Sequence, residues 1–84
     1  MPPVQRDGDV NDNGGPAVGG FSSVRVNGRA VVVDGTPVAE HGPKNVTTGG
    51  VGSVRAGGIP INVDGNPDAC KHSRTGGSGD VRAG

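Results

Sequence analysis

The stretch VRVNGRAVVVDG, residues 24–35, decides the fold because it carries a complete β-hairpin signal. Asn27 and Gly28 separate two runs rich in β-branched residues. Both residue types accept the positive φ angles that a two-residue type I′ turn requires. No part of the chain has the period or the length of an amphipathic helix. We therefore expect a hairpin here and an all-β protein.

The same stretch recurs further along the chain as VRAGGIPINVDG, residues 54–65. The match extends over residues 19–39 and 49–69, where about half of the aligned pairs are identical. A third copy is split between the chain ends: VRAG, residues 81–84, continues without a gap into MPPVQRDG, residues 1–8, when Met1 is placed after Gly84. The sequence is therefore interpreted as a closed ring of three units.

Aligned positions of the three units alternate between two faces, as they do in a strand. One face holds Val4, Val31 and Ile61, and the other holds Gln5, Val32 and Asn62. Because a single two-stranded hairpin is not stable in water, the three units must pack on one another. We predict one domain over residues 1–84, a small cone of three pseudo-three-fold β-hairpins, the third formed by the N- and C-terminal strands.

The composition leaves little material for a hydrophobic core. Only 30% of the 84 residues are hydrophobic, and Phe21 is the single aromatic residue. Chains this small usually need a metal, a disulfide or a partner for stability. Since Cys70 is the only cysteine, an internal disulfide is excluded, which leaves a metal, an oligomer or a host assembly.

The charge pattern argues against nucleic acid and membrane insertion. Eight basic and eight acidic residues balance, without a basic stripe or an aromatic platform. The longest apolar run, residues 30–33, is far too short to span a bilayer. The first residues lack the apolar core of a signal peptide, so we expect any export to proceed without a conventional secretion signal.

Candidate metal ligands lie on the three arms that follow the Asp-Gly steps, residues 9–15, 36–43 and 66–72. Asn13, His41, Cys70 and His72 fall at nearly equivalent places on these arms. Imidazole and thiolate are the donors that zinc prefers. Their spacing alone also fits exposed histidines and an inert thiol, but equivalent arms converge near the axis. We therefore predict one structural zinc ion.

No constellation for catalysis is evident. Asp7, Asp34 and Asp64 recur beside glycine, where aspartate ordinarily shapes turns. No serine has a His/Asp context, and the glycine-rich residues 49–52 lack the lysine and the helix of a phosphate-binding loop. We predict that the protein is not an enzyme.

Residues 3–9, PVQRDGD, are similar to the Pro-Ala-Ala-Arg strand and Gly-Asp turn that give PAAR-repeat proteins their name. Residues 30–35 and 60–65 resemble degenerate copies of this element that lack the arginine. The resemblance covers nearly the whole chain. It implies a conical monomer that caps the trimeric β-helical spike of a type VI secretion system or a contractile phage tail, and that meets the target membrane only transiently.

The resemblance also implies a zinc site near the vertex, held in the family by three histidines and one cysteine. His41, Cys70 and His72 match three of these ligands. Asn13 stands in the place of the remaining histidine, so water, Asn13 or Asp12 would complete the coordination shell.

The partner contact is expected at the base, with Arg25, Arg55 and Arg82 near it. The expected location is a virion tail tip or the tip of an exported secretion spike, and the degenerate motifs favour a phage. Two other classes remain open at this stage: a stand-alone zinc-binding module and a disordered glycine-rich linker.

Overall fold

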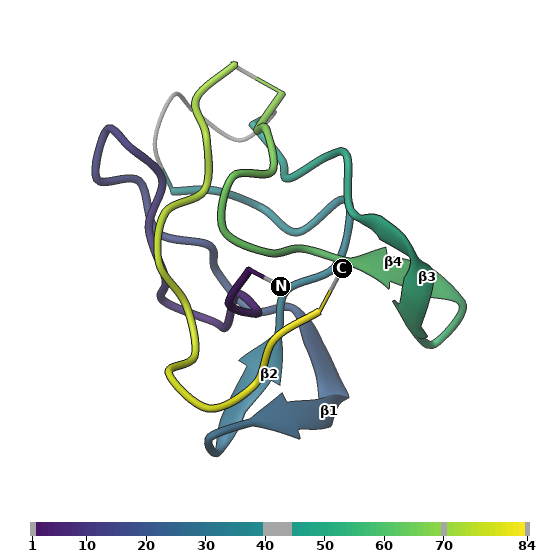
Figure 1. The fold of residues 1–84 in the computed structure, drawn as a ribbon. Helices are drawn as coiled ribbons and strands as arrows, with labels where there is room; N and C mark the ends of the chain where they lie inside the picture. Colours follow the sequence, from purple (N-terminus) through teal and green to yellow (C-terminus); the bar gives the residue numbers. More distant parts are fainter. Residues whose placement is uncertain (1, 40–44, 70, 84) are drawn as a thin grey trace.

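The computed structural model describes residues 2–39, 45–69 and 71–83. Within these ranges the chain forms two antiparallel hairpins and no helix (Figure 1). Strand β1 (Phe21–Val26) pairs with β2 (Arg29–Val31), and β3 (Val51–Ala56) pairs with β4 (Ile59–Ile61). The predicted all-β class is confirmed. None of the described segments is a helix long and apolar enough to cross a membrane.

Both hairpins turn as the sequence predicts. Asn27 and Gly28 have φ angles of 54° and 78°, and Gly57 and Gly58 have φ angles of 59° and 81°. Consecutive positive φ angles are the mark of a type I′ turn, whose twist matches that of the flanking strands. In the first hairpin the register shifts between Phe21 and Arg25, and the second hairpin repeats this shift at the aligned positions. The two hairpins are therefore equivalent even in the position of this shift in strand pairing.

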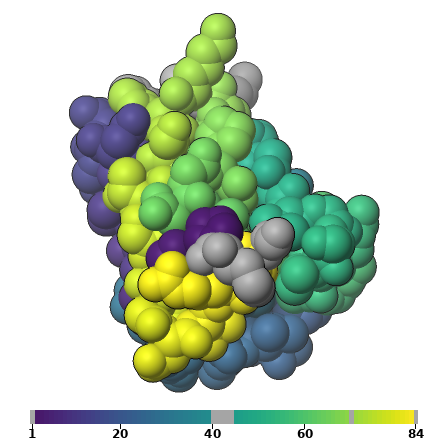
Figure 2. Space-filling model, viewed as in Figure 1, coloured from purple at the N-terminus to yellow at the C-terminus, as the bar shows by residue number. Residues whose placement is uncertain are grey.

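The terminal segments pair with each other, as predicted for the N- and C-terminal strands. Pro3 and Arg82 form an antiparallel bridge. The Val4 amide donates to the Val81 carbonyl at 2.9 Å, and the Ala83 amide donates to the Pro2 carbonyl at 3.1 Å. In Figure 2 the yellow C-terminal segment accordingly lies against the purple N-terminal segment.

A closed cycle of three backbone hydrogen bonds joins the three units at the centre. The Gln5 amide donates to the Asn62 carbonyl at 3.0 Å, Asn62 to Val32 at 2.8 Å, and Val32 back to Gln5 at 3.1 Å. A second equivalent set follows two residues later, in which the amides of Asp7, Asp34 and Asp64 donate to the carbonyls of Ala30, Pro60 and Pro3. The aligned sequence positions are therefore equivalent in hydrogen bonding.

The two faces of these central segments are both buried, but they differ in chemistry. On the first face, Val4, Val31 and Ile61 belong to one apolar cluster. The other members of that cluster are Val26, Val33, Ala56, Val63 and Ala83. On the opposite face lie the three residues of the hydrogen-bonded cycle, all with no exposed surface. The interior is thus apolar on the hairpin side and largely polar on the arm side.

Three equivalent glycines permit close backbone contacts. A Cβ atom on Gly20, Gly50 or Gly77 would lie 2.4, 2.7 or 2.6 Å from the carbonyl oxygens of Val31, Ile61 and Val4, respectively. Contacts under 3.0 Å are sterically excluded, so no side chain fits at these positions without movement of the backbone. The glycines therefore allow each unit to fold back onto its own central strand.

Candidate metal centre and docking face

The three arms are joined to one another in a second cycle. The amide of Asp12 donates to the carbonyl of Ser73, Ala39 to Pro16 and Ala69 to Val46, at 2.8–2.9 Å. Each arm thus bonds to the segment that follows another arm. In Figure 1 the described parts of arms one and three lie on the side opposite the β1–β2 hairpin. Two distinct faces follow: an arm face and a hairpin face.

On the arm face, His72 is held by a carboxylate from another arm. Its Nδ1 lies 2.9 Å from Oδ1 of Asp12, with the His72 side chain 31% exposed. Because an ionised carboxylate can only accept, this contact fits the tautomer with the proton on Nδ1, in which Nε2 is the nitrogen that would bind a metal. Carboxylates orient metal-binding histidines in this way in many proteins. The local geometry therefore fits a metal ligand.

The structure describes two of the four expected metal ligands, Asn13 and His72. Asn13 lies in the exposed tip of arm one, where its amide donates to Oδ1 of Asn11 at 3.0 Å. His41 and Cys70 lie outside the described residues. Among residues 2–39, 45–69 and 71–83, no three His, Cys, Asp or Glu side chains come together to hold a metal. The zinc ion stays a prediction.

Beneath the arms lies a buried ion pair that sequence reasoning missed. Nη1 of Arg74 is 3.0 Å from Oδ2 of Asp68, and neither side chain has exposed surface. Arg74 also donates from Nε to Oε1 of Gln5 at 3.1 Å and from Nη2 to the carbonyl of Asp9. Asn11 donates to the same Asp68 carboxylate at 2.8 Å. Buried charges are tolerated when they are paired and hydrogen-bonded in this manner, and the guanidinium thereby ties arm one to arm three.

The alignment of the three units contains a signal for this pair. Arg74 occupies the place of Ala17 and Thr47. The residue after each of the three donates its amide to a carbonyl of an arm: Val18 to Pro37, Thr48 to Pro67 and Thr75 to Val10. Asp68 occupies the place of Val38, and both positions are buried in every unit. Two opposite charges at buried positions that are uncharged in the other units indicate an internal ion pair. The signal becomes readable only when the alignment is extended into the arms.

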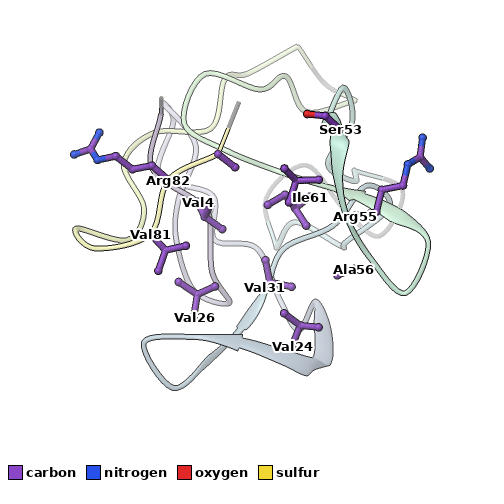
Figure 3. A pocket seen from close by; sticks show the side chains of 12 residues that line it. Val4, Val24, Val26, Val31, Ser53, Arg55, Ala56, Ile61, Val81 and Arg82 are labelled. Carbon is purple, nitrogen blue, oxygen red and sulfur yellow. The ribbon is translucent and has the colours of Figure 1, made fainter.

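The hairpin face contains an apolar cavity of about 380 Å³, which we call the basal cavity (Figure 3). Each layer of its wall takes one residue from each unit. The buried floor is formed by Val4, Val31 and Ile61; the buried wall by Val26, Ala56 and Ala83; and the mouth by Val24, Val54 and Val81. The mouth valines are 40%, 39% and 39% exposed, so the three units present nearly equal apolar surface to solvent.

The three expected partner-binding arginines each directly follow a mouth valine in the chain, and two of them, Arg55 and Arg82, belong to the cavity lining. All three are exposed. Arg25 donates to the Gly28 carbonyl of its own turn at 3.1 Å, and Arg55 donates to the Gly58 carbonyl at 3.0 Å. Figure 3 shows the side chains of Arg55 and Arg82 directed away from the cavity. The mouth is therefore apolar at its centre and cationic at its rim.

No protein-family model matches the chain, and a comparison with curated proteins finds no match. The fold and the two faces define the protein by its geometry. It is a small all-β protein whose equivalent segments are joined in a cycle of backbone hydrogen bonds. The arm face carries a histidine, and the hairpin face is apolar.

Proposed function

We propose that this protein is the tip of a membrane-piercing spike. In this function the chain is a cone of three pseudo-three-fold hairpins with the arms at its vertex. Its base caps a trimeric β-helical spike protein, one tip per trimer, in a contractile phage tail or a type VI secretion system. The action is mechanical: the narrow vertex concentrates the contraction force on a small patch of the target membrane. No catalysis and no nucleic acid take part.

The observation that carries the proposal is the three-fold composition of the basal cavity and its mouth. One chain offers three nearly equally exposed valines at one cavity, and each is followed in the chain by an exposed arginine. A monomer gains such an arrangement when its partner is a trimer, because matching symmetry lets three identical chains make three similar contacts. Metal binding by a stand-alone module does not require this arrangement.

The arm face supports the vertex of the proposed cone. His41, Cys70 and His72 would hold one zinc ion, which would supply structural cross-linking between the arms. The contact between Asp12 and His72 favours a role for Asp12 as the carboxylate that orients this ligand. Asn13 or water would then complete the shell.

The decisive experiment is copurification with a trimeric β-helical spike protein from the same genome. We expect a complex of one tip chain per trimer by multi-angle light scattering. If the two proteins elute separately at micromolar concentration, the spike-tip function is wrong. The neighbouring genes would also distinguish a phage tail from a secretion system.

Metal content is a separate prediction. Protein purified without added metal should contain one zinc ion per chain by elemental analysis, and a chelator should lower its melting temperature. Cys70→Ser should weaken zinc binding most, because thiolate is the strongest donor of the set. Substoichiometric metal together with a melting temperature unchanged by chelator would contradict the site.

The alternative function is a stand-alone zinc-binding module. The oriented His72 favours it as much as it favours the spike tip, since a metal serves both. The two functions differ at the opposite face: a zinc module would bind metal normally and show no affinity for the spike trimer.

A further inference from the structure

The basal cavity has the wrong lining for a small soluble ligand. Its volume, about 380 Å³, lies within the range of roughly 300–1,000 Å³ found for ligand pockets. Such pockets also carry a few polar groups that orient the ligand. Of the lining side chains only Ser53, Arg55 and Arg82 are polar, and the two arginines are directed away from the interior in Figure 3. The cavity therefore suits an apolar group whose orientation is set by contacts that lie outside the cavity.

The charged residues around the mouth indicate which chemical groups of a partner would surround the apolar group in the cavity. Arg25 and Arg55 each donate to the turn carbonyl of their own hairpin, so both guanidinium groups are held on the hairpins that carry the mouth valines and are directed outward. A guanidinium has five N–H donors, so further donors remain available for a carboxylate, which it can bind in a bidentate manner. Asp80, next to Val81 in the chain, accepts from Nδ2 of Asn27 at 3.1 Å and keeps its negative charge, so it offsets only part of the positive charge of the arginines.

A second copy of this chain is a poor occupant of the cavity. Two hairpin faces in contact would bring two rings of three arginines together, and like charges across an interface oppose association. The charge pattern favours an acidic partner over a symmetric dimer.

We propose that the basal cavity is a socket for an apolar plug on the three-fold axis of the spike trimer, and that carboxylates of the trimer surround this plug and pair with Arg25, Arg55 and Arg82. The inference rests on the proposed spike-tip function and names the chemistry of its contact. The plug buries the mouth valines, while the carboxylates select the partner and set the register of docking.

The test measures binding of the spike trimer to the full chain by isothermal titration calorimetry. Val54→Asp places a charge at the mouth, and its matched control is Val18→Asp, another exposed valine, at 52%, that does not line the cavity. We expect Val54→Asp to weaken binding at least tenfold and Val18→Asp to leave it unchanged. Melting temperatures within a few degrees of the wild type verify that both variants fold.

The rim is tested by Arg55→Glu, with Lys71→Glu on arm three as the control of equal charge change. We expect at least a tenfold loss for Arg55→Glu, no loss for Lys71→Glu, and a wild-type affinity that falls with added salt, since exposed ion pairs are screened. A folded Arg55→Glu variant with wild-type affinity, or an affinity insensitive to salt, would overturn the acidic rim.

The outcomes separate this inference from the function on which it rests. If the wild-type chain does not bind the trimer, the spike-tip function itself fails. If the wild type binds and folded Val54→Asp binds equally well, the trimer docks elsewhere and only the socket is wrong. Saturable binding of dodecanoate that Val54→Asp abolishes, with spike binding intact, would identify a lipid pocket. A wild-type dimer that Val54→Asp dissociates would identify self-association instead.

Discussion

Gly50 and Gly52 lie two residues apart at the start of β3, yet the structure constrains only one of them. A Cβ atom on Gly50 would lie 2.7 Å from both Oδ1 of Asp34 and the carbonyl of Ile61, whereas a Cβ atom on Gly52 would meet nothing within 4 Å. Neither glycine has a positive φ angle. The pair therefore isolates the effect of space from the effect of backbone conformation.

We predict that Gly50→Ala destabilises the fold by about 1–3 kcal/mol, the cost of overpacking a close contact. Gly52→Ala should change the stability by less than about 0.5 kcal/mol, as exposed substitutions usually do. For a domain of this size, each kcal/mol corresponds to roughly 4–8 °C in melting temperature. Equal melting temperatures for the two variants would contradict the close approach of Gly50 to its neighbours.

Arg74 is the other single residue on which the fold depends strongly. Arg74→Met would leave the buried Asp68 carboxylate with Asn11 as its remaining side-chain partner. Removal of one member of a buried pair costs about 3–5 kcal/mol. We expect the double variant Arg74→Met with Asp68→Leu to regain part of this loss, because neither buried charge remains. Thermal unfolding of both variants checks the prediction, and an unaffected Arg74→Met variant would contradict it.

Among the elements, the contacts between units explain why the repeats diverge in sequence. Phe21 packs against the turn of the second hairpin, where a Cβ atom on Gly57 would lie 2.4 Å from its ring. At the equivalent contact with the first hairpin, Ser78 donates from Oγ to Oδ1 of Asn27. A large residue thus faces glycine at one contact, and a small one faces asparagine at the other. Each pair is complementary, so the units cannot be interchanged freely.

We predict that Gly57→Asn, which copies the turn of the first hairpin, destabilises the protein although asparagine suits a type I′ turn. The added side chain would collide with Phe21. Combining it with Phe21→Ser, which copies the third unit, should restore part of the lost stability. Chemical denaturation of the single and double variants measures this coupling, and additive effects would contradict it.

Over the whole molecule, sequence alone predicted the hairpins, their type I′ turns, the two faces of the central segments and the pairing of the termini. These features follow from short-range signals: Asn-Gly and Gly-Gly steps, alternation, and a repeat that is complete only when the ends are joined. The ion pair of Arg74 and the contact of Asp12 with His72 were missed. They depend on side chains that differ between the units, and a repeat identifies what the units share.

The closure of the ring predicts that a circular permutant will fold. The permutant joins Gly84 to Met1 and opens the chain between Asn27 and Gly28, at an exposed turn. We expect circular dichroism and metal content like those of the wild type, with a modest loss of stability because Asn27 contacts Ser78 and Asp80. A control permutant opened between Val32 and Val33 should fail to fold, because the cut falls within the central cycle. Folding of both permutants would contradict the importance of that cycle.

The pairing of Pro2–Val4 with Val81–Ala83 also sets how the molecule responds to load. Pulled by its two ends, the chain would open at the 2–83 contact first and then at the 4–81 contact, one hydrogen bond at a time, like a zipper. We expect a compressive load between the arm face and the hairpin face to press the three units together instead, because such a load does not separate the two chain ends. We expect a protein that opens at lower force when it is pulled by its two ends than when it is compressed between the arm face and the hairpin face.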